Sequence, residues 1–432
     1  MTLNFGEDPM ATTELMEKSN QAPTVTLTPG RRRLLVSSLL AGNLMMVAIS
    51  AAVIGILVPQ QVANIDPAGK VNALAVVTAF SSLAAIFVQP IVGALSDRTR
   101  SRLGRRSPWI VYGGIGGGLA VVALQFSTSV FAITVIWVIA QILLNAVSGP
   151  MSSIIADRIE MRKRATASAF AGVGIAVGGA SGVIVGGLLL EMLGVAYTIF
   201  GIGAIIVCVL FVILNPDVSS APMKVDPFKW KAFARSFWIS PRKHPDYGWA
   251  FAGRFFIVLG YQGIASYLLY ILQDYINIPT AQSGIVAGEV AVISMIAITV
   301  STILFGRLSD RLNRRKVFVF AASIIMAAGA LIPILSPTIM SMYLYGLLVG
   351  IGYGAYLSVD MALMIDVLPS TGSIGKDLGV LNIAINVPAA ITPVIAASLL
   401  GLFSENYVVI FGYSIIATII SSLMVLPIKS VR

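Results

Sequence analysis

Residues 93–106 read GALSDRTRSRLGRR, and residues 306–315 read GRLSDRLNRR. Both stretches place Gly-x-x-x-Asp-Arg ahead of a basic pair, and they lie about half of the 432-residue chain apart. A weaker echo places Asp157 and Asp366 at the ends of two long apolar segments. Such internal similarity predicts a chain built from two related halves.

The composition predicts that the chain lies in a membrane. Of its residues, 57% are hydrophobic and 11% are charged, whereas soluble domains carry roughly 25% charged residues. This excludes an ordinary soluble globular enzyme, and the apolar content excludes a disordered chain. Since a membrane-spanning helix needs about 20 apolar residues, the chain is long enough for twelve. We expect helices at about 34–58, 71–95, 109–126, 130–155, 165–190, 195–214, 247–273, 281–304, 317–335, 340–366, 374–401 and 405–427.

The positions of the basic residues predict the orientation of these helices. The chain has 29 Lys and Arg residues against 19 Asp and Glu, a formal net charge of +10. Nearly all the basic residues fall in alternate connections and in the two tails. The other connections hold Lys70 alone, and Arg254 lies within a helix. This asymmetry predicts cytoplasmic termini in a plasma or bacterial inner membrane, and it gives no support to nucleic-acid binding.

The longest polar interruption divides the chain into two groups of six helices. It mixes basic and aromatic residues, which suits either an amphipathic segment on the membrane surface or a solvated linker. We expect a cytoplasmic tail, a first six-helix bundle, a cytoplasmic linker, a second bundle and a C-terminal tail at 1–33, 34–214, 215–246, 247–427 and 428–432. Two related bundles are typical of a carrier with a binding site between them near mid-membrane.

The duplicated motif resembles the signature loop of the major facilitator superfamily, which lies between the second and third helices. The second copy fits with Asn313 in the place of a Gly. The resemblance covers residues 34–427. It implies an all-α membrane protein with twelve transmembrane helices in two pseudo-symmetric bundles, functioning as a monomer among membrane lipids.

A narrower resemblance is to the glycoside and sucrose-type proton symporters. Residues 96–109, SDRTRSRLGRRSPW, are similar to their extended motif, as are residues 149–157 and residues 375–379 with Asn382. This implies a sugar or glycoside as the small-molecule substrate. Sucrose-type proteins usually carry an acid where Gln141 stands, and melibiose-type relatives use acids in helices two and four that this chain lacks. The resemblance therefore implies the substrate class better than the coupling ion.

Four glycines at steps of four residues form one face of the fifth predicted helix, at Gly174, Gly178, Gly182 and Gly186. This pattern is typical of close helix packing in membranes. Drug antiporters of the superfamily have a related Gly-rich motif with a Pro where this chain has Gly179, which counts against a drug antiporter.

Polar side chains inside the apolar segments are the candidates for a binding site, since they are costly in lipid. Amides, hydroxyls and aromatic rings match the hydroxyls and C–H faces of a neutral sugar. The same residue types also form hydrogen bonds between helices. The substrate-binding candidates are Asn43, Gln141, Asn145, Arg254, Tyr261, Gln262, Tyr353, Tyr356, Asp360, Asn382 and Asn386.

The ionisable groups that lie well inside the predicted spans are few, and the candidates are Arg254, Glu289 and Asp360 in the second half. A cation in hydrocarbon favours a partner. Arg254 therefore pairs with Asp360 or Glu289, binds an anionic substrate, or extends its charge to the membrane surface. If a proton drives transport, Asp360 or Glu289 must carry it. The alternative is a facilitator without a coupling ion.

The repeated loops are candidates for a cytoplasmic gate, because charged pairs at helix ends can form and separate as a carrier changes conformation. The alternative is that these basic residues only fix the topology. The gate candidates are Asp97, Arg98, Arg105, Arg106, Asp157, Asp310, Arg311, Arg314, Arg315 and Asp366.

The sequence thus predicts a secondary transporter of a small polar solute, with a sugar or glycoside and proton symport as the leading expectation. The chain has no metal-ligand cluster, nucleophile–base set or nucleotide loop, so we expect no enzymatic activity, no metal and no cofactor besides the proton. An exporter of drugs or metabolites, an uncoupled sugar facilitator and a non-transporting membrane sensor are the alternatives.

Overall fold

The computed structural model describes residues 28–222, 245–312, 315–367 and 374–428, without the side chains of residues 310, 361–367 and 374–383. These residues form helices and no strands. The first half contains α2 (Pro29–Ala52), η1 (Val53–Leu57), α3 (Val58–Ile65), α4 (Lys70–Ser96), α5 (Ser107–Ala123), η2 (Leu124–Phe126), α6 (Val130–Arg158), α7 (Met161–Leu188) and α8 (Leu193–Leu214). The second contains α10 (Pro245–Ala265), α11 (Leu268–Tyr270), η3 (Ile271–Tyr275), α12 (Thr280–Leu312), α13 (Arg315–Leu335), α14 (Ile339–Val367), α15 (Ile374–Leu402) and α16 (Val408–Val425).

The predicted twelve spans are present in the described part of the chain. Eleven helices are long and apolar enough to cross a membrane, and α10 with the segment from Leu268 to Tyr275 forms a twelfth span with a bend of 44°. A helix satisfies its own backbone hydrogen bonds, so apolar segments of this length take this form in hydrocarbon. The fold class predicted from composition is confirmed.

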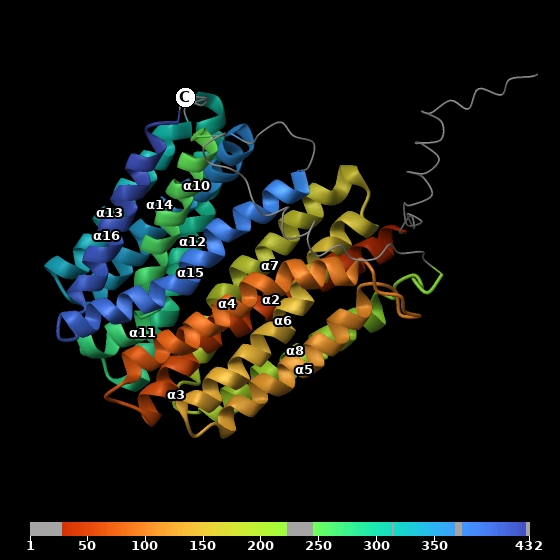
Figure 1. The fold of residues 1–432 in the computed structure, drawn as a ribbon, viewed down its shortest axis with the longest axis horizontal. Coiled ribbons are helices and arrows are strands. Elements are labelled where there is room, and N and C mark those ends of the chain that lie inside the picture. Colours follow the sequence, from red (N-terminus) through yellow and green to blue (C-terminus); the bar gives the residue numbers. More distant parts are fainter. Residues whose placement is uncertain (1–27, 223–244, 313–314, 368–373, 429–432) are drawn as a thin grey trace, which may run out of the picture.

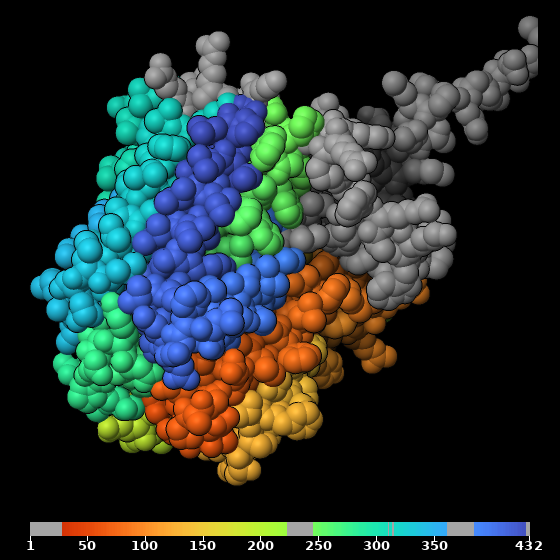
Figure 2. All heavy atoms as spheres, turned by 60° about the vertical axis from the view of Figure 1, so that its left-hand side comes forward, coloured from red at the N-terminus to blue at the C-terminus, as the bar shows by residue number. Residues whose placement is uncertain are grey.

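The helices form two bundles that lie side by side, with α2–α8 in one and α10–α16 in the other (Figure 1). The same packing recurs in both bundles: α4 contacts α6 as α12 contacts α14, and α5 contacts α8 as α13 contacts α16. The bundles meet where α4 packs on α15 and α7 packs on α12. Figure 2 shows the blue atoms of α15 against the orange atoms of α4. These repeated contacts are the structural counterpart of the sequence repeat.

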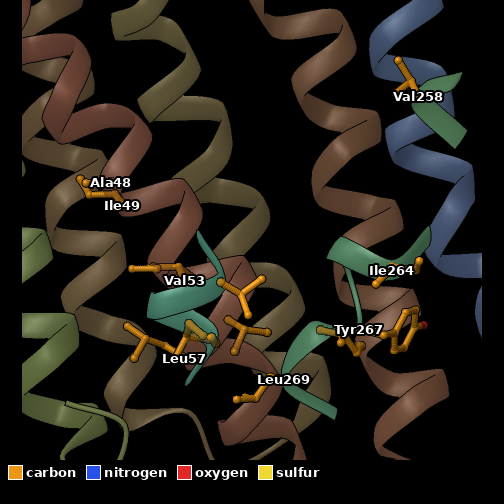
Figure 3. Close-up of a cluster of buried hydrophobic side chains, with 14 of the residues drawn as sticks. Ala48, Ile49, Val53, Leu57, Val258, Ile264, Tyr267 and Leu269 are labelled. Atoms are coloured by element: carbon orange, nitrogen blue, oxygen red, sulfur yellow. The ribbon is translucent and has the colours of Figure 1, made fainter. Parts of the chain in front are cut away.

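A continuous set of buried side chains joins the two bundles. Ile49, Val53 and Leu57 of the first span belong to the same cluster as Ile264 and Tyr267 of the seventh (Figure 3). Side chains that contact across the two bundles in this way form a common core.

The first span is longer than predicted and continues to Ile65. A π-helical turn at Val53–Leu57 precedes Pro59. This wider turn accommodates the proline ring, which would otherwise clash with the carbonyl four residues earlier. Gln61, beyond the predicted end, is buried. It donates to the carbonyls of Leu124 (2.9 Å) and Ser127 (3.2 Å).

The seventh span is interrupted where a single helix at 247–273 was predicted. Helix α10 ends at Ala265, and the chain resumes as α11 and the π-helical η3. The first span of each bundle therefore contains a π-helical turn. Such turns are frequent at functional sites, and both lie toward the end of the bundles where Lys70 is found. We call this the Lys70 end, and we call the opposite end, with residues 97–106, the basic end.

The glycine face of α7 packs directly on α2, as its spacing predicted. A Cβ atom at Gly174 would lie 2.5 Å from the carbonyl oxygen of Leu40, and one at Gly182 would lie 2.2 Å from that of Ala48. The α7 backbone can approach α2 this closely only because these residues lack a side chain.

We predict that Gly182→Leu separates α7 from α2. The substitution should lower the free energy of unfolding by about 1–3 kcal/mol or more, which is the usual cost of overpacking. The control is Gly172→Leu on the same helix, where an added Cβ would meet no atom within 4 Å. Thermal unfolding of the purified proteins in detergent measures the effect. Equal melting temperatures for the two variants would contradict the packing argument.

Candidate functional site

A cavity of about 490 Å³ lies between the two bundles. Its walls come from the first and fifth spans of one bundle and from α10–α11, α12 and α14 of the other. This volume is within the range of roughly 300–1,000 Å³ that small-molecule sites occupy. Its polar lining residues are Ser50, Tyr261, Gln262, Ser266, Ser294, Thr299 and Tyr345.

The cavity offers hydrogen bonds and aromatic surface without formal charge. None of its lining residues in the described chain is an Asp, Glu, Lys, Arg or His. The hydroxyl of Ser294 donates to the carbonyl of Gly346 (3.1 Å) and that of Thr299 to Met295 (2.8 Å), so their lone pairs remain available as acceptors. A small uncharged molecule with its own hydroxyl or amide groups matches this lining.

Two predicted binding residues, Tyr261 and Gln262, line the cavity. The ring of Tyr261 stacks on that of Tyr353, with centroids 4.2 Å apart and planes within 8°. Tyr353 and Tyr356 are also neighbours, with centroids 6.3 Å apart. The predicted tyrosines of α10 and α14 thus form a continuous aromatic group that begins at the cavity wall.

Arg254 and Asp360 form a buried ion pair toward the basic end, with Nη1 and Oδ2 3.2 Å apart. The hydroxyl of Tyr356 donates to the other carboxylate oxygen of Asp360. Arg254 precedes Tyr261 by seven residues, and Asp360 follows Tyr353 by seven, so the ion pair lies about 10 Å along the helices from the stacked tyrosines. Of the two acidic partners predicted for Arg254, Asp360 is the one that it contacts.

Among the described residues, the other predicted polar side chains do not line the cavity. Asn145 accepts a hydrogen bond from Gln89 of α4 (3.1 Å) and donates to Gln141 Oε1 (3.2 Å). Asn43 donates to the carbonyl of Leu39 in its own helix (2.8 Å). Asn386 is partly buried on α15. The side chain of Asn382 lies outside the described residues. Glu289 is exposed on α12, where it accepts a hydrogen bond from Tyr343.

Several cavity residues were absent from the sequence prediction, namely Ser266, Ser294, Thr299 and Tyr345. Tyr345 could have been recognised from the sequence. It lies eight residues, or about two helical turns, before Tyr353 and so continues the face that Tyr353 and Asp360 define. The serine and threonine residues had none, since mid-helix hydroxyls commonly donate to the preceding turn.

The predicted gate residues of the first repeat form one network at the basic end. Arg106 contacts Asp97 (2.5 Å) and Asp157 (3.0 Å), and Arg105 contacts Asp157 (2.6 Å). The guanidinium of Arg106 also donates to Ser96 Oγ (2.5 Å). This network ties the ends of α4, α5 and α6 together within the first bundle.

The loop around this network is held by the start of the linker. The hydroxyl of Ser220 donates to the carbonyl of Thr99 (2.8 Å) and accepts from the amide of Ser101 (3.0 Å). Gly104 has φ of +87°, and a Cβ there would lie 2.4 Å from Asp217. Only glycine fits this turn, which explains why a glycine precedes the basic pair in the first motif. Most of the linker, including its predicted amphipathic segment, lies outside the described residues.

The second repeat is described only in part. Arg311 is exposed and Arg315 is partly buried, and Arg98 of the first repeat is partly buried. The side chains of Asp310 and Asp366, and the whole of Arg314, lie outside the described residues.

The bundles are joined by polar contacts at the Lys70 end. Lys70 forms an ion pair with Asp274 (2.7 Å) and lies 5.0 Å from the centroid of the Tyr270 ring. Tyr270 donates to the carbonyl of Pro59 (2.8 Å), and Gln273 donates to Gln60 Oε1 (2.9 Å).

Tyr267 adds a second link between the bundles. Its hydroxyl lies within hydrogen-bond distance of the carbonyls of Val71 (3.2 Å) and Pro393 (3.0 Å), at the contact of α4 with α15. On the opposite side, a Cβ at Gly187 of α7 would lie 2.1 Å from the carbonyl oxygen of Gly284 of α12. The interrupted seventh span supplies most of these contacts, so the two bundles are closed against each other at this end.

Twelve spans in two bundles of matching internal packing, with a cavity between them, define the architecture of a secondary transporter. The chain belongs to the Major Facilitator Superfamily, whose family model matches residues 39–288 and 250–431. The family predicted from the repeated motif is confirmed.

Solved transporters share this fold at low sequence identity. The nucleoside transporter NupG, in a variant form, is similar with a TM-score of 0.72 and 14% identity over 90% of this chain and 99% of that one. A bacterial homolog of the human lysosomal transporter Spinster, inward-facing and unoccupied, gives 0.67 and 16% over 93% and 95%. A D-xylose-proton symporter gives 0.65 and 14% over 92% and 97%. No curated protein sequence matches the chain significantly.

We predict that Lys70→Gln raises the ratio of open to closed molecules at the Lys70 end by up to about fivefold. The reason is that a partly exposed ion pair contributes up to about 1 kcal/mol. Single-molecule energy transfer between fluorophores on cysteines introduced at this end, one in each bundle, measures the open fraction in nanodiscs. The native Cys208 is buried and is expected to stay unlabelled.

The matched control is Lys163→Gln, which removes the ion pair of Lys163 with Glu160 (2.8 Å) at the basic end of the first bundle. This pair joins the N-cap residue of α7 to the first turn of the same helix and does not link the bundles. An equal effect of both substitutions, or no effect of Lys70→Gln, would show that the Lys70–Asp274 pair does not hold this end closed.

Proposed function

We propose that the chain imports a small uncharged polar solute, a sugar or glycoside, by alternating access coupled to a proton. The uncharged cavity between the bundles is the observation that carries the proposal. In this proposal the basic end faces the cytoplasm, with both termini, because the described Lys and Arg residues outside the spans lie there, with the exception of Lys70.

The cavity lining supports the substrate class. A sugar presents hydroxyl groups that donate and accept hydrogen bonds, and C–H faces that pack on aromatic rings. Gln262 offers both a donor and an acceptor, and Tyr261 and Tyr345 offer rings. The similarity of residues 96–109 to glycoside and sucrose-type symporters points to the same class.

Asp360 is the proposed proton carrier. It is the acidic side chain that is buried among the described residues, and it contacts both Arg254 and Tyr356. Protonation of its carboxyl would weaken the ion pair with Arg254, and the aromatic group of Tyr356, Tyr353 and Tyr261 extends from there to the cavity. Proton binding and solute binding would thus act on the same packed side chains.

The two ends supply the proposed gates. Solute entry from outside requires the contacts of Lys70 and Tyr267 with the opposite bundle to separate. At the cytoplasmic end, the Arg106 network with Asp97 and Asp157 holds the first bundle as one unit while the bundles move. We assign the second repeat, with Asp310 and Arg311, the corresponding role in the second bundle.

The test is uptake of labelled disaccharides and monosaccharides into proteoliposomes, with and without an inward proton gradient. We expect accumulation of a sugar above its external concentration only with the gradient. Sugar uptake that ignores the gradient would replace symport by a facilitator. Gradient-driven exit would make the protein an exporter. Absence of uptake together with a sugar-dependent thermal shift would favour a sensor.

We predict that Asp360→Asn abolishes accumulation against a concentration gradient but retains exchange of labelled for unlabelled sugar, because the carboxyl that binds the proton is gone. The control is Glu405→Gln, which removes an exposed carboxylate between α15 and α16.

Loss of one partner from a buried ion pair costs about 3–5 kcal/mol, so Asp360→Asn is also tested together with Arg254→Gln, which removes both charges. Unchanged accumulation in both the single and the double variant would remove Asp360 from the coupling role and leave Glu289 as the candidate.

A further inference from the structure

A second cavity, of about 470 Å³, lies at the outer surface of the molecule where α7 meets α12. Ile184 and Leu188 of α7 form one wall, and Ile285 and Val292 of α12 form the other. Its polar side chains are Glu289 of α12 and Tyr343 of α14. We call it the lateral pocket. It shares no lining residue with the central cavity.

Glu289 lies within the part of α12 that is long and apolar enough to cross a membrane. The membrane span of α12 runs from Thr280 to Ser309. Glu289 is about 8 Å along the helix from the middle of this span, at 1.5 Å per residue. The hydrocarbon extends about 15 Å to either side of the midplane. A carboxylate on this face of α12 therefore lies within the apolar layer of the Lys70 end.

The charge of Glu289 has no basic partner among the described residues. No Lys, Arg or His nitrogen of that part of the chain lies within 4.0 Å of its carboxylate. The hydroxyl of Tyr343 donates to one carboxylate oxygen. One hydrogen bond does not compensate a carboxylate for loss of water, so the charged form of Glu289 favours a cation beside it.

We propose that the lateral pocket binds a lipophilic amine, with its ammonium group on Glu289 and its apolar body between α7 and α12. The carboxylate would accept a charge-assisted hydrogen bond from the ammonium group. Ile184, Leu188, Ile285 and Val292 would cover the apolar part. The amine would reach the pocket from the surrounding hydrocarbon, because Glu289 is exposed on the outside of the bundles.

The depth and lining favour a singly charged amphiphile over a zwitterionic lipid. A lipid headgroup lies at the membrane surface, and its phosphate would meet the apolar side chains of the pocket, where no basic residue offsets its charge. A neutral sugar is also excluded as the occupant, since Glu289 and Tyr343 are the only polar side chains among the described lining residues.

The lateral pocket also crosses the junction of the two bundles. Gly288 lies beside Glu289, and a Cβ there would be 3.1 Å from the Cα of Ile184 on α7. Its walls exist together only while α7 and α12 are in contact. A bound amine would therefore contact both bundles and stabilise the conformation that is closed at the Lys70 end.

The test is a thermal shift of the full-length protein in phosphatidylcholine nanodiscs, with dodecylamine as the probe and dodecanol as the uncharged probe with the same chain. We expect dodecylamine to raise the melting temperature in a concentration-dependent way, because a ligand that binds only the folded state stabilises it. Dodecanol should produce no shift of comparable size. Glu289→Gln should weaken dodecylamine binding at least tenfold.

The control is Glu191→Gln, which removes an exposed carboxylate just beyond α7 that does not line the pocket. Dodecylamine should shift this variant as it shifts the unmodified protein. Tyr343→Phe retains the charge of Glu289 and should retain most of the shift.

An equal shift in the Glu289→Gln variant, or an equal shift with dodecanol, would overturn the proposal. The proposal would also be overturned if dodecylamine caused no rise in melting temperature, while replacing part of the phosphatidylcholine by phosphatidylethanolamine did cause one. The occupant would then be a lipid headgroup. The measurement uses no transported solute, so its failure is distinguishable from failure of the proposed sugar transport.

Discussion

Hydrocarbon offers no partner to a backbone amide, a carbonyl or a charge, and the structure of this chain follows from that constraint. The described residues that cross the membrane are helical because a helix satisfies its own backbone. The helices then associate through close packing, since lipid chains are as apolar as their side chains. The glycine face of α7 on the backbone of α2 is the clearest example, with Gly178 placed where a Cβ would lie 2.4 Å from the carbonyl oxygen of Leu44. Polar groups within the spans are correspondingly few, and each has a specific environment.

The same constraint explains which features could be predicted from the sequence. Apolar segments of sufficient length give the spans, and the repeat around Asp97 and Asp310 gives the two related bundles and their family. The glycine spacing on α7 predicts a helix contact because its periodicity is that of the helix itself. The aromatic and acidic face of α14, from Tyr353 to Asp360, is visible for the same reason. Each of these patterns is a local property of a single segment of the chain.

Features that arise between segments were not predicted. The chain changes direction in the seventh span at Ser266 and Tyr267. Neither residue is a proline or carries a charge, so the sequence does not indicate the bend. The contacts that close the Lys70 end join residues that are far apart in sequence, such as Gln60 and Gln273. Most of the cavity lining consists of small apolar and hydroxyl residues that are common in any membrane helix. The position of such residues depends on how two bundles face each other, which no single segment specifies.

The two carboxylates that the sequence placed within the second bundle illustrate how environment separates residues of the same type. Asp360 is buried inside the bundle, and its charge is matched by Arg254. Protonation there changes an internal ion pair, which is the kind of change that can bias two conformations of a packed core. Glu289 faces outward, beside a junction that opens when the bundles separate, and its charge is matched by no basic residue of the described chain. We therefore propose a cationic partner for Glu289 from outside the described part of the chain. The first environment suits a step in the transport cycle, and the second suits a ligand that acts on that cycle from the membrane.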